Sequence, residues 1–205
     1  DVSSVTEMSY LFSGATSFDQ PLDNWDVSNV IRMIGMFASS SFNRDISNWN
    51  TSNVTAMAGM FAGTPMNQPL NNWDVSKVWD FNSMFARTNA FNQPLDNWNT
   101  QGATDMQAMF SSASAFNQNI SNWDTSNVST TRYMFDGATS FNQPLNSWNT
   151  SKVTDMERMF KAATSYNQPL DNWNVSNVTN MTNMFEGATS YNQPLDNWNV
   201  SNVTN

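Results

Sequence analysis

The chain has 205 residues, of which 39% are hydrophobic and 12% are charged, and its formal net charge is −9. Cys and His are both absent, which excludes disulfides, cysteine metal sites and serine–histidine or cysteine–histidine catalysis. Eight basic residues against seventeen acidic ones argue against nucleic acid and anionic membrane surfaces as partners. The apolar runs are too short to cross a bilayer, and we expect neither a membrane-spanning segment nor a signal peptide here.

Tryptophan recurs through the chain at an almost constant interval. Eight of these residues are separated by 24 or 25 positions, namely Trp25, Trp49, Trp73, Trp98, Trp123, Trp148, Trp173 and Trp198. A unit of this length cannot bury its few apolar side chains alone, so neighbouring units must stack and share a core. We therefore predict one repeat solenoid over residues 1–205, with about eight repeats. Neither end has a polar capping repeat, which indicates a fragment of a longer array.

Each repeat is predicted to contain a short strand followed by a helical turn. In the copy over 166–190, Pro169 precedes an apolar segment, 170–175, that alternates near its end and predicts a very short parallel strand. Apolar residues from Val178 to Ala188 then recur at spacings of three and four, which predicts a short helix or helical turn. In the preceding repeat, 154–157 matches a capping box for such a helix.

The apolar positions that recur in every repeat are predicted to form the core. A row of tryptophans could instead be a stacking platform for sugars, since indoles pack well against sugar rings. A large aromatic residue that recurs in every turn of a solenoid is more often shared packing. The Met and Phe positions, at helical spacing, are also predicted to be buried.

Several elements recur in phase: Asn-Val-Thr at 177–179, Met-Phe at 184–185, Gly-Ala-Thr-Ser at 187–190, Gln-Pro-Leu at 193–195, and Trp198. This pattern resembles the BspA-like bacterial surface protein repeat, also described as a mycoplasma lipoprotein-associated repeat. Essentially the whole chain matches, with single departures such as Ala103 for Val and Asn119 for Pro. The resemblance implies a leucine-rich-repeat-like right-handed solenoid, exported to the cell surface, with adhesion as its usual role. It implies no catalytic residues.

Outward positions are the candidate binding residues, because a solenoid binds through its exposed ladders. The residue after each Trp alternates between Asp and Asn, and the predicted ligand-binding residues on this strip are Asp26, Asn50, Asp74, Asn99, Asp124 and Asn174. The Asn before each Trp is expected to form a ladder along the stack or to satisfy turn amides. Carboxylates recur too irregularly for calcium and lie in no unique pocket for catalysis, so we predict no metal, no cofactor and no enzymatic activity.

Two aromatic residues depart from the repeat. Trp79 replaces the usual Thr, and Tyr133 stands where Gly, Ala or Ser is common. Both are predicted to point outward, where they either anchor a partner or pack on a neighbouring turn. Asn-X-Ser/Thr triplets also recur, and in a eukaryotic secreted protein they would be glycan acceptors, among them Asn53, Asn127, Asn177 and Asn202.

These observations predict a non-enzymatic repeat protein, extracellular or on the cell surface, that mediates adhesion to a protein or glycan ligand. The alternative is a structural spacer or a self-assembling extracellular filament component, whose contacts are mostly with copies of itself.

Overall fold

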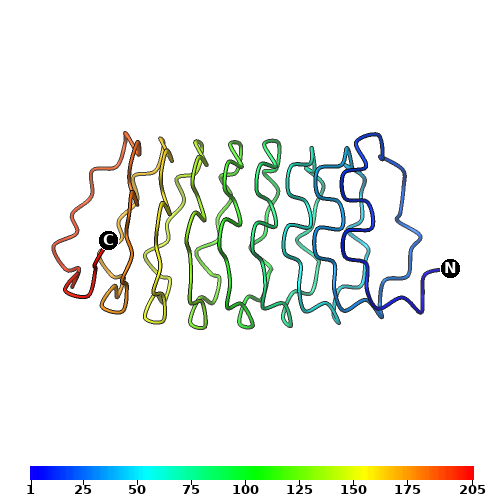
Figure 1. Cartoon of the computed structure of the whole chain (residues 1–205), viewed down its shortest axis with the longest axis horizontal. Helices are drawn as coiled ribbons and strands as arrows, with labels where there is room; N and C mark the ends of the chain where they lie inside the picture. Colours follow the sequence, from blue (N-terminus) through cyan, green and yellow to red (C-terminus); the bar gives the residue numbers. More distant parts are fainter.

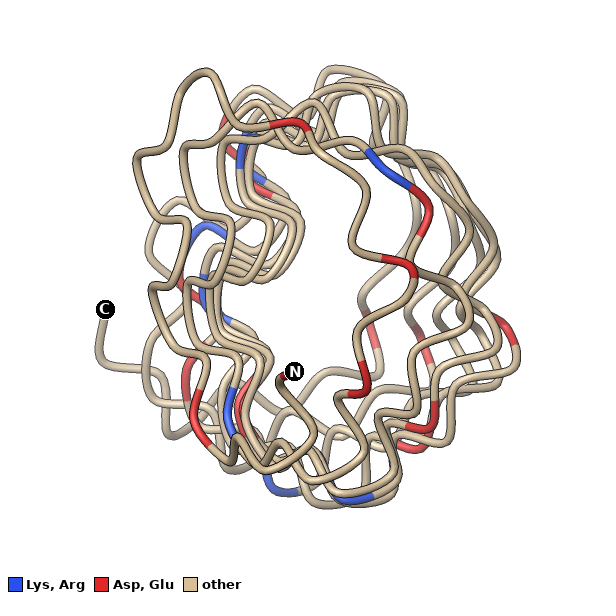
Figure 2. Cartoon of the chain, turned by 90° about the vertical axis from the view of Figure 1, so that its right-hand side faces the viewer, with Lys and Arg blue, Asp and Glu red and all other residues tan.

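The computed structural model describes all residues from 1 to 205. The chain winds into a stack of similar coils, with its two termini at opposite ends of the stack (Figure 1). Viewed along the stack, the coils nearly superimpose (Figure 2). Each unit of 24 or 25 residues forms one coil, and equivalent residues of successive coils therefore form columns.

The predicted strand and helix of each repeat are both wrong. The chain contains no helix, and its extended pairing consists of isolated parallel bridges that link one residue of each coil to the next. The bridged residues are Glu7, Arg32, Ala56, Asp80, Asp105, Thr130, Asp155 and Asn180. The leucine-rich-repeat-like architecture of strand plus helix is therefore not the fold of this chain. With no helix present, none is long and apolar enough to span a membrane.

The segment predicted to be a strand forms two tight turns instead. The amide of Trp173 donates to the carbonyl of Leu170 at 3.1 Å. The amide of Ser176 then donates to Oδ1 of Asn174, also at 3.1 Å, which makes an Asx turn. Aspartate and asparagine favour such turns because their side chains bond the backbone two residues on. Two turns within 170–176 leave no room for extended pairing.

The segment predicted to be helical contains two left-handed residues per coil, four positions apart. In one coil these are Tyr133, with φ of 58°, and Gly137, with φ of 72°. Amide donors alternate between the same coil and the next: Met134 donates to Thr131, whereas Phe135 donates to Met159 of the following coil. An α-helix requires negative φ throughout and bonds to the carbonyl four residues back. The apolar spacing of three and four thus arises from successive tight turns.

Aromatic side chains stack through the interior. The rings of Phe110, Phe135 and Phe160 follow one another with centroid distances of 5.9 and 5.6 Å. The predicted core position of the tryptophans is confirmed in the middle of the stack, where Trp123 is 3% exposed and its indole N–H donates to the carbonyl of Leu95 at 3.0 Å. Most of the Met and Phe columns are buried as well, also as predicted.

An asparagine ladder runs along the stack in a second column, in addition to contacts in the predicted one. It is formed by the Asn before each Gln. Oδ1 of Asn117 accepts the amide of Asn142 at 2.9 Å and the side-chain nitrogen of Gln143 at 3.0 Å. In the predicted column, before each Trp, some residues bond along the stack, as Asn48 does to the carbonyl of Asp23 at 2.9 Å. Many of the asparagine and glutamine side chains therefore form hydrogen bonds between successive coils.

Candidate binding surface

The polar strip after each Trp is exposed, and each of its members also shapes its own coil. Oδ1 of Asp26 accepts the amide of Ser28 at 3.0 Å, and Oδ1 of Asn50 accepts the amide of Ser52 at 3.2 Å. Equivalent Asx turns form at the other predicted residues, Asp74, Asn99, Asp124 and Asn174. One oxygen of each side chain is thus committed to a turn, and the other oxygen or nitrogen faces solvent.

Hydrogen bonds keep the carboxylates of this strip ionised. The hydroxyl and the amide of the serine two residues later hold the pKa of Asp26, Asp74 and Asp124 below its usual value. A hydrogen bond to the charged form of an acid favours that form. The strip is therefore a negatively charged surface at neutral pH, with at most one carboxylate per coil in this column.

Trp79 lies on the outside of the stack, as predicted. Its side chain is 46% exposed, in a column of which most other members are Thr or Ser. Ile31, two coils away in that column, is 45% exposed. The Trp79 backbone is bonded on both sides, because its amide donates to Thr55 and its carbonyl accepts from Thr104, both at 3.0 Å. The indole is thus presented by a fixed backbone.

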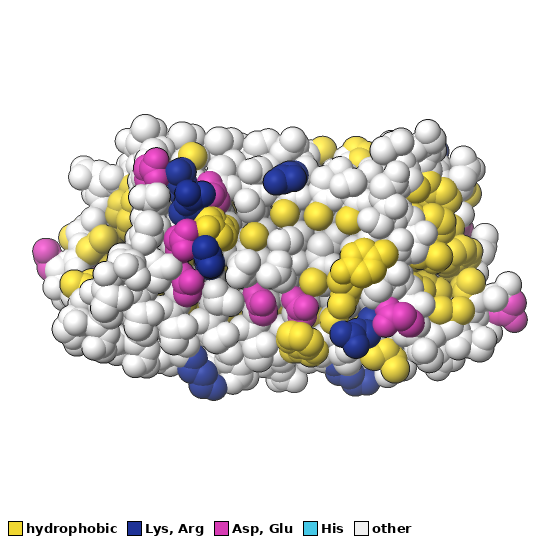
Figure 3. Space-filling view, in the orientation of Figure 1, with side chains coloured by type: hydrophobic (Ala, Val, Ile, Leu, Met, Phe, Trp, Pro, Cys, Tyr) yellow, Lys and Arg dark blue, Asp and Glu magenta, His cyan; other side chains and the backbone are white.

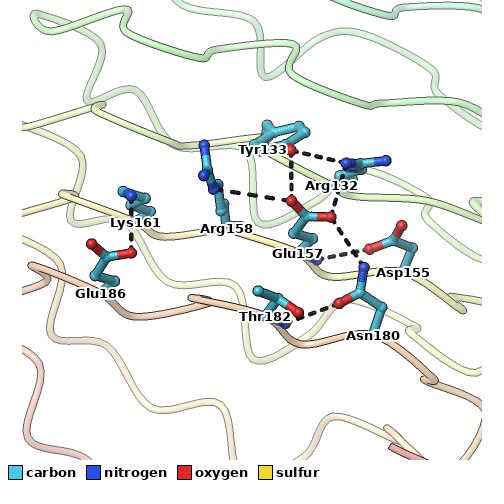
Figure 4. Close-up of polar contacts among 9 residues, drawn as sticks. All are labelled: Arg132, Tyr133, Asp155, Glu157, Arg158, Lys161, Asn180, Thr182 and Glu186. Carbon is cyan, nitrogen blue, oxygen red and sulfur yellow. Dashed lines mark hydrogen bonds and ion pairs between the residues drawn. The ribbon is translucent and has the colours of Figure 1, made fainter. Parts of the chain in front are cut away.

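Tyr133 is only half-buried and packs on the neighbouring coil, which is one of the two alternatives predicted for it. Its hydroxyl donates to Oε1 of Glu157 at 2.6 Å and accepts from Nη2 of Arg132 at 2.9 Å (Figure 4). The Arg132 and Arg158 guanidinium carbons lie 4.7 and 5.5 Å from the centroid of the Tyr133 ring. This side chain is therefore engaged within the molecule and is not a free aromatic anchor.

Glu157 is the centre of a charged network that the sequence did not indicate. It pairs with Arg132 at 2.8 Å and accepts from Nδ2 of Asn180 at 3.1 Å. The hydrogen bond from Tyr133, with these partners, holds the pKa of Glu157 below its usual value. The predicted capping box at 154–157 is wrong, because Glu157 reaches to neighbouring coils and no helix begins there. Its network joins three successive coils.

The surface between the ladders is hollowed where side chains are small. A hollow of about 340 Å³ crosses four neighbouring coils and is lined by residues such as Ala62, Ser83 and Ala108, with Arg87 its one charged lining residue. Figure 3 shows that charged side chains gather toward the C-terminal half of the face in view, whereas hydrophobic side chains cover more of the other half. The hollow contains no pair of acidic side chains that could act as general acid and base.

The four asparagines of the predicted glycosylation triplets also form hydrogen bonds between coils. Nδ2 of Asn53 donates to the carbonyl of Ser28 at 2.8 Å, and Nδ2 of Asn127 donates to that of Gln101 at 3.0 Å. Asn177 and Asn202 make the same contact with the preceding coil, both at 2.7 Å. All four side chains are exposed, and the nitrogen that a glycan would modify is already a hydrogen-bond donor within the array.

A family described as "Mycoplasma protein of unknown function, DUF285" matches the chain over residues 1–66, 63–161 and 115–205. Together these matches extend from the first residue to the last, and the chain therefore belongs to this family. Comparison with curated proteins finds no match.

Proposed function

We propose that the chain is a non-enzymatic binding segment of a surface-exposed protein, and that its outward side chains contact a protein or glycan ligand. One observation carries this proposal. Trp79, in the middle of the stack, exposes nearly half of its side chain in a column dominated by small hydroxyl residues. Exposed tryptophans are enriched among the residues that dominate binding energy at interfaces, because they bury a large area with few rotatable bonds.

The contrast between repeated inward residues and variable outward residues in each coil supports a binding role. Inward residues repeat the same types and form continuous ladders, as Phe110 and Phe135 do. Outward residues vary, and the column of Trp79 also contains Ile31 and Ser129. A scaffold stabilised by its repeated residues tolerates such variation at its surface, where function is located in repeat proteins.

The location and the type of function follow the BspA-like resemblance of the sequence. That family is associated with the cell surface and with adhesion. The absence of Cys and His and the use of strip carboxylates in Asx turns favour binding over catalysis. The partner is then a protein or glycan on another surface.

The test is a binding screen with the folded chain. Immobilised wild-type chain and Trp79→Thr are exposed to a panel of extracellular matrix proteins and glycans, and binding is measured by surface plasmon resonance. We expect at least one wild-type interaction, weakened about tenfold or more in Trp79→Thr. Thr104→Ser, which introduces the residue that Ser129 supplies in the same column, is the matched control and should bind as wild type. Absence of wild-type binding across the panel would contradict the proposal.

A structural spacer is the second candidate function. It is favoured by the ladders that pass through successive coils without interruption, of which the asparagine contacts from Asn43 to Asn192 are an example. Stacking at about 4.8 Å per coil would give a rod of roughly 40 Å for eight coils. Ordered filaments of the native full-length protein in electron micrographs, together with no ligand in the screen above, would support this candidate over binding.

A further inference from the structure

Trp79 lies beside two adjacent carboxylates, and Trp79, Asp80 and Asp105 are hereafter the Trp79 patch. Asp80 and Asp105 are paired by a parallel bridge between neighbouring coils. The carbonyl oxygen of Trp79 accepts the amides of both Thr104, at 3.0 Å, and Asp105, at 3.1 Å. The indole and the two carboxylates therefore come from two short segments of neighbouring coils, which are joined by these two backbone hydrogen bonds.

Both carboxylates lack a cationic partner. Oδ1 of Asp80 accepts the amide of Asn82 at 3.0 Å, and Oδ1 of Asp105 accepts the amide of Gln107 at 2.8 Å, which leaves Oδ2 of each without a hydrogen bond. None of the ion pairs in the structure includes either residue. Burial raises the pKa of Asp80 and the charge of Asp105 raises it further, whereas the hydrogen bond from the Asn82 amide and the charge of Arg32 lower it in part. The patch thus holds two like charges, neither of which is in an ion pair.

Lys77 and Arg32, two basic side chains of the same face, have their polar contacts elsewhere. Nζ of Lys77 donates to Oδ1 of Asn53 at 2.9 Å. Arg32, two coils away in the bridge column, has its ion pair with Glu7, at 3.8 Å. Neither makes an ion pair with the two carboxylates, although the charge of Arg32 acts on Asp80 from a distance, so Oδ2 of each carboxylate is open to a cation from a second molecule.

We propose that the Trp79 patch binds a basic segment of a partner protein, with a Lys or Arg side chain stacked on the Trp79 indole and its charge directed to Asp80 and Asp105. The inference rests on the proposed function and specifies its ligand. Tryptophan is the best aromatic partner for a cation, and arginine in particular combines stacking with bonds to carboxylates. The net charge of −9 adds a long-range attraction for the same class of partner.

A neutral glycan fits the patch less well. A sugar ring would also stack on the indole, but it would not neutralise the two adjacent carboxylates. Charge complementarity therefore favours the basic partner, and a glycan is an outcome that the experiment must separate.

The repeat itself supplies conservative substitutions for the test. Trp79→Thr introduces the residue found at Thr55 and Thr104 in the same column. Asp80→Asn and Asp105→Thr introduce the residues of Asn180 and Thr130 in theirs. The matched control is the double variant Asp23→Asn/Asp196→Asn, two exposed aspartates in a column that holds asparagine at Asn71 and Asn146. Like Asp80→Asn/Asp105→Thr, it removes two negative charges, but from another part of the surface.

The probe is an acetylated tetra-arginine peptide, with its uncharged citrulline counterpart and maltoheptaose as comparisons, and binding is measured by fluorescence anisotropy or calorimetry at physiological salt. We expect wild type to bind the arginine peptide and not the citrulline peptide. Trp79→Thr and Asp80→Asn/Asp105→Thr should each weaken binding about tenfold or more, whereas the control double variant should stay within about twofold of wild type. Thermal unfolding of every variant establishes that it is folded.

Three results would overturn the inference. Equal weakening by the control double variant would show diffuse attraction to an acidic surface. Binding of maltoheptaose that depends on Trp79 but not on the two carboxylates would show a glycan platform. Absence of arginine-peptide binding, while the chain still binds a member of the matrix panel, would remove this inference and leave the proposed function intact; absence of both would remove both.

Discussion

The indole N–H of Trp98 donates to the carbonyl oxygen of Leu70, 28 residues earlier in the preceding coil, at 3.0 Å. The same carbonyl accepts the amide of Trp73 within its own coil, at 3.1 Å. One carbonyl therefore joins a turn within a coil to the tryptophan of the next coil. Repeated along the stack, this arrangement fixes the spacing and rotation of the coils, and with them the positions of the outward side chains.

Trp98→Phe should lower the free energy of unfolding by about 1–2 kcal/mol, because it removes a buried hydrogen bond and part of the ring volume. Urea denaturation measures this change. Trp25, which is partly buried and has no indole hydrogen bond to an earlier coil, provides the control, and Trp25→Phe should cost less. Equal losses at the two positions would contradict a stabilising role for the indole hydrogen bond.

Left-handed backbone positions give a prediction whose sign depends on the fold. Ala108 has φ of 53°, and Ala108→Gly should stabilise the chain by about 1 kcal/mol, because glycine adopts this conformation without strain. Gly59→Ala should destabilise it by roughly 1 kcal/mol or more, although the nearest atom to the added Cβ is 4.0 Å away. In a helix both signs would be reversed, so chemical denaturation of these two variants separates the two folds.

The sequence predicts the stack of repeats and its buried columns. It does not predict the tight turns that form each repeat in place of a strand and a helix. The interval between tryptophans predicts the stack and its buried columns. The apolar spacing from Val178 to Ala188 also fits a helix, because tight turns with bonds three residues apart bring the same positions inward. Glycine in only some copies of the left-handed columns, with Tyr133 and Ala108 in others, hides the feature that excludes a helix. The recurrence of glycine at these two positions in several repeats is the sequence feature that indicates a left-handed backbone there.

The candidate site was predictable in the same partial way. Trp79 is conspicuous because it breaks a column of small residues, and the structure places its side chain outside. The unpaired carboxylates beside it were not predictable, because their adjacency depends on the position of the parallel bridges, which differs from the predicted strand. The network around Glu157 likewise depends on contacts between successive coils.

Asn117 tests the asparagine ladder. Asn117→Ala leaves the amide of Asn142 without its acceptor and removes one of the two acceptors of the Gln143 side chain, which keeps the Asn117 carbonyl. It should cost about 1–2 kcal/mol of unfolding free energy. Asn117→Asp keeps the acceptor, as Asp19 does for the amide of Asn43 at 3.0 Å, and should retain most of the stability at neutral pH. Denaturation of the two variants in parallel checks this, and an aspartate variant as unstable as the alanine variant would argue against the ladder.

Glu157 should make stability depend on pH. Its folded pKa lies below its unfolded pKa, chiefly because of the Tyr133 hydrogen bond, so the carboxylate stabilises the fold above the unfolded pKa. That contribution is lost as the pH falls through the folded pKa. The difference in Tm between wild type and Glu157→Gln should therefore be largest near neutral pH and shrink in acid, as measured by calorimetry from about pH 7 to about pH 3.

Glu186→Gln is the control for this series, because Glu186 is 53% exposed and pairs only with Lys161, at 2.9 Å. Its removal should change Tm little at any pH, as expected for an exposed ion pair. A Glu157→Gln difference that stays constant across the range would show that the network does not stabilise the ionised carboxylate.

The separation between buried tryptophans and the one outward indole underlies both the fold and the proposed binding surface, and hydroxyl-radical footprinting with mass spectrometry measures it directly. Trp79 should be oxidised rapidly, whereas tryptophans in the middle of the stack should be protected, namely Trp49, Trp73, Trp98, Trp123 and Trp148. Protection of Trp79, or oxidation spread evenly over the tryptophans, would contradict this account.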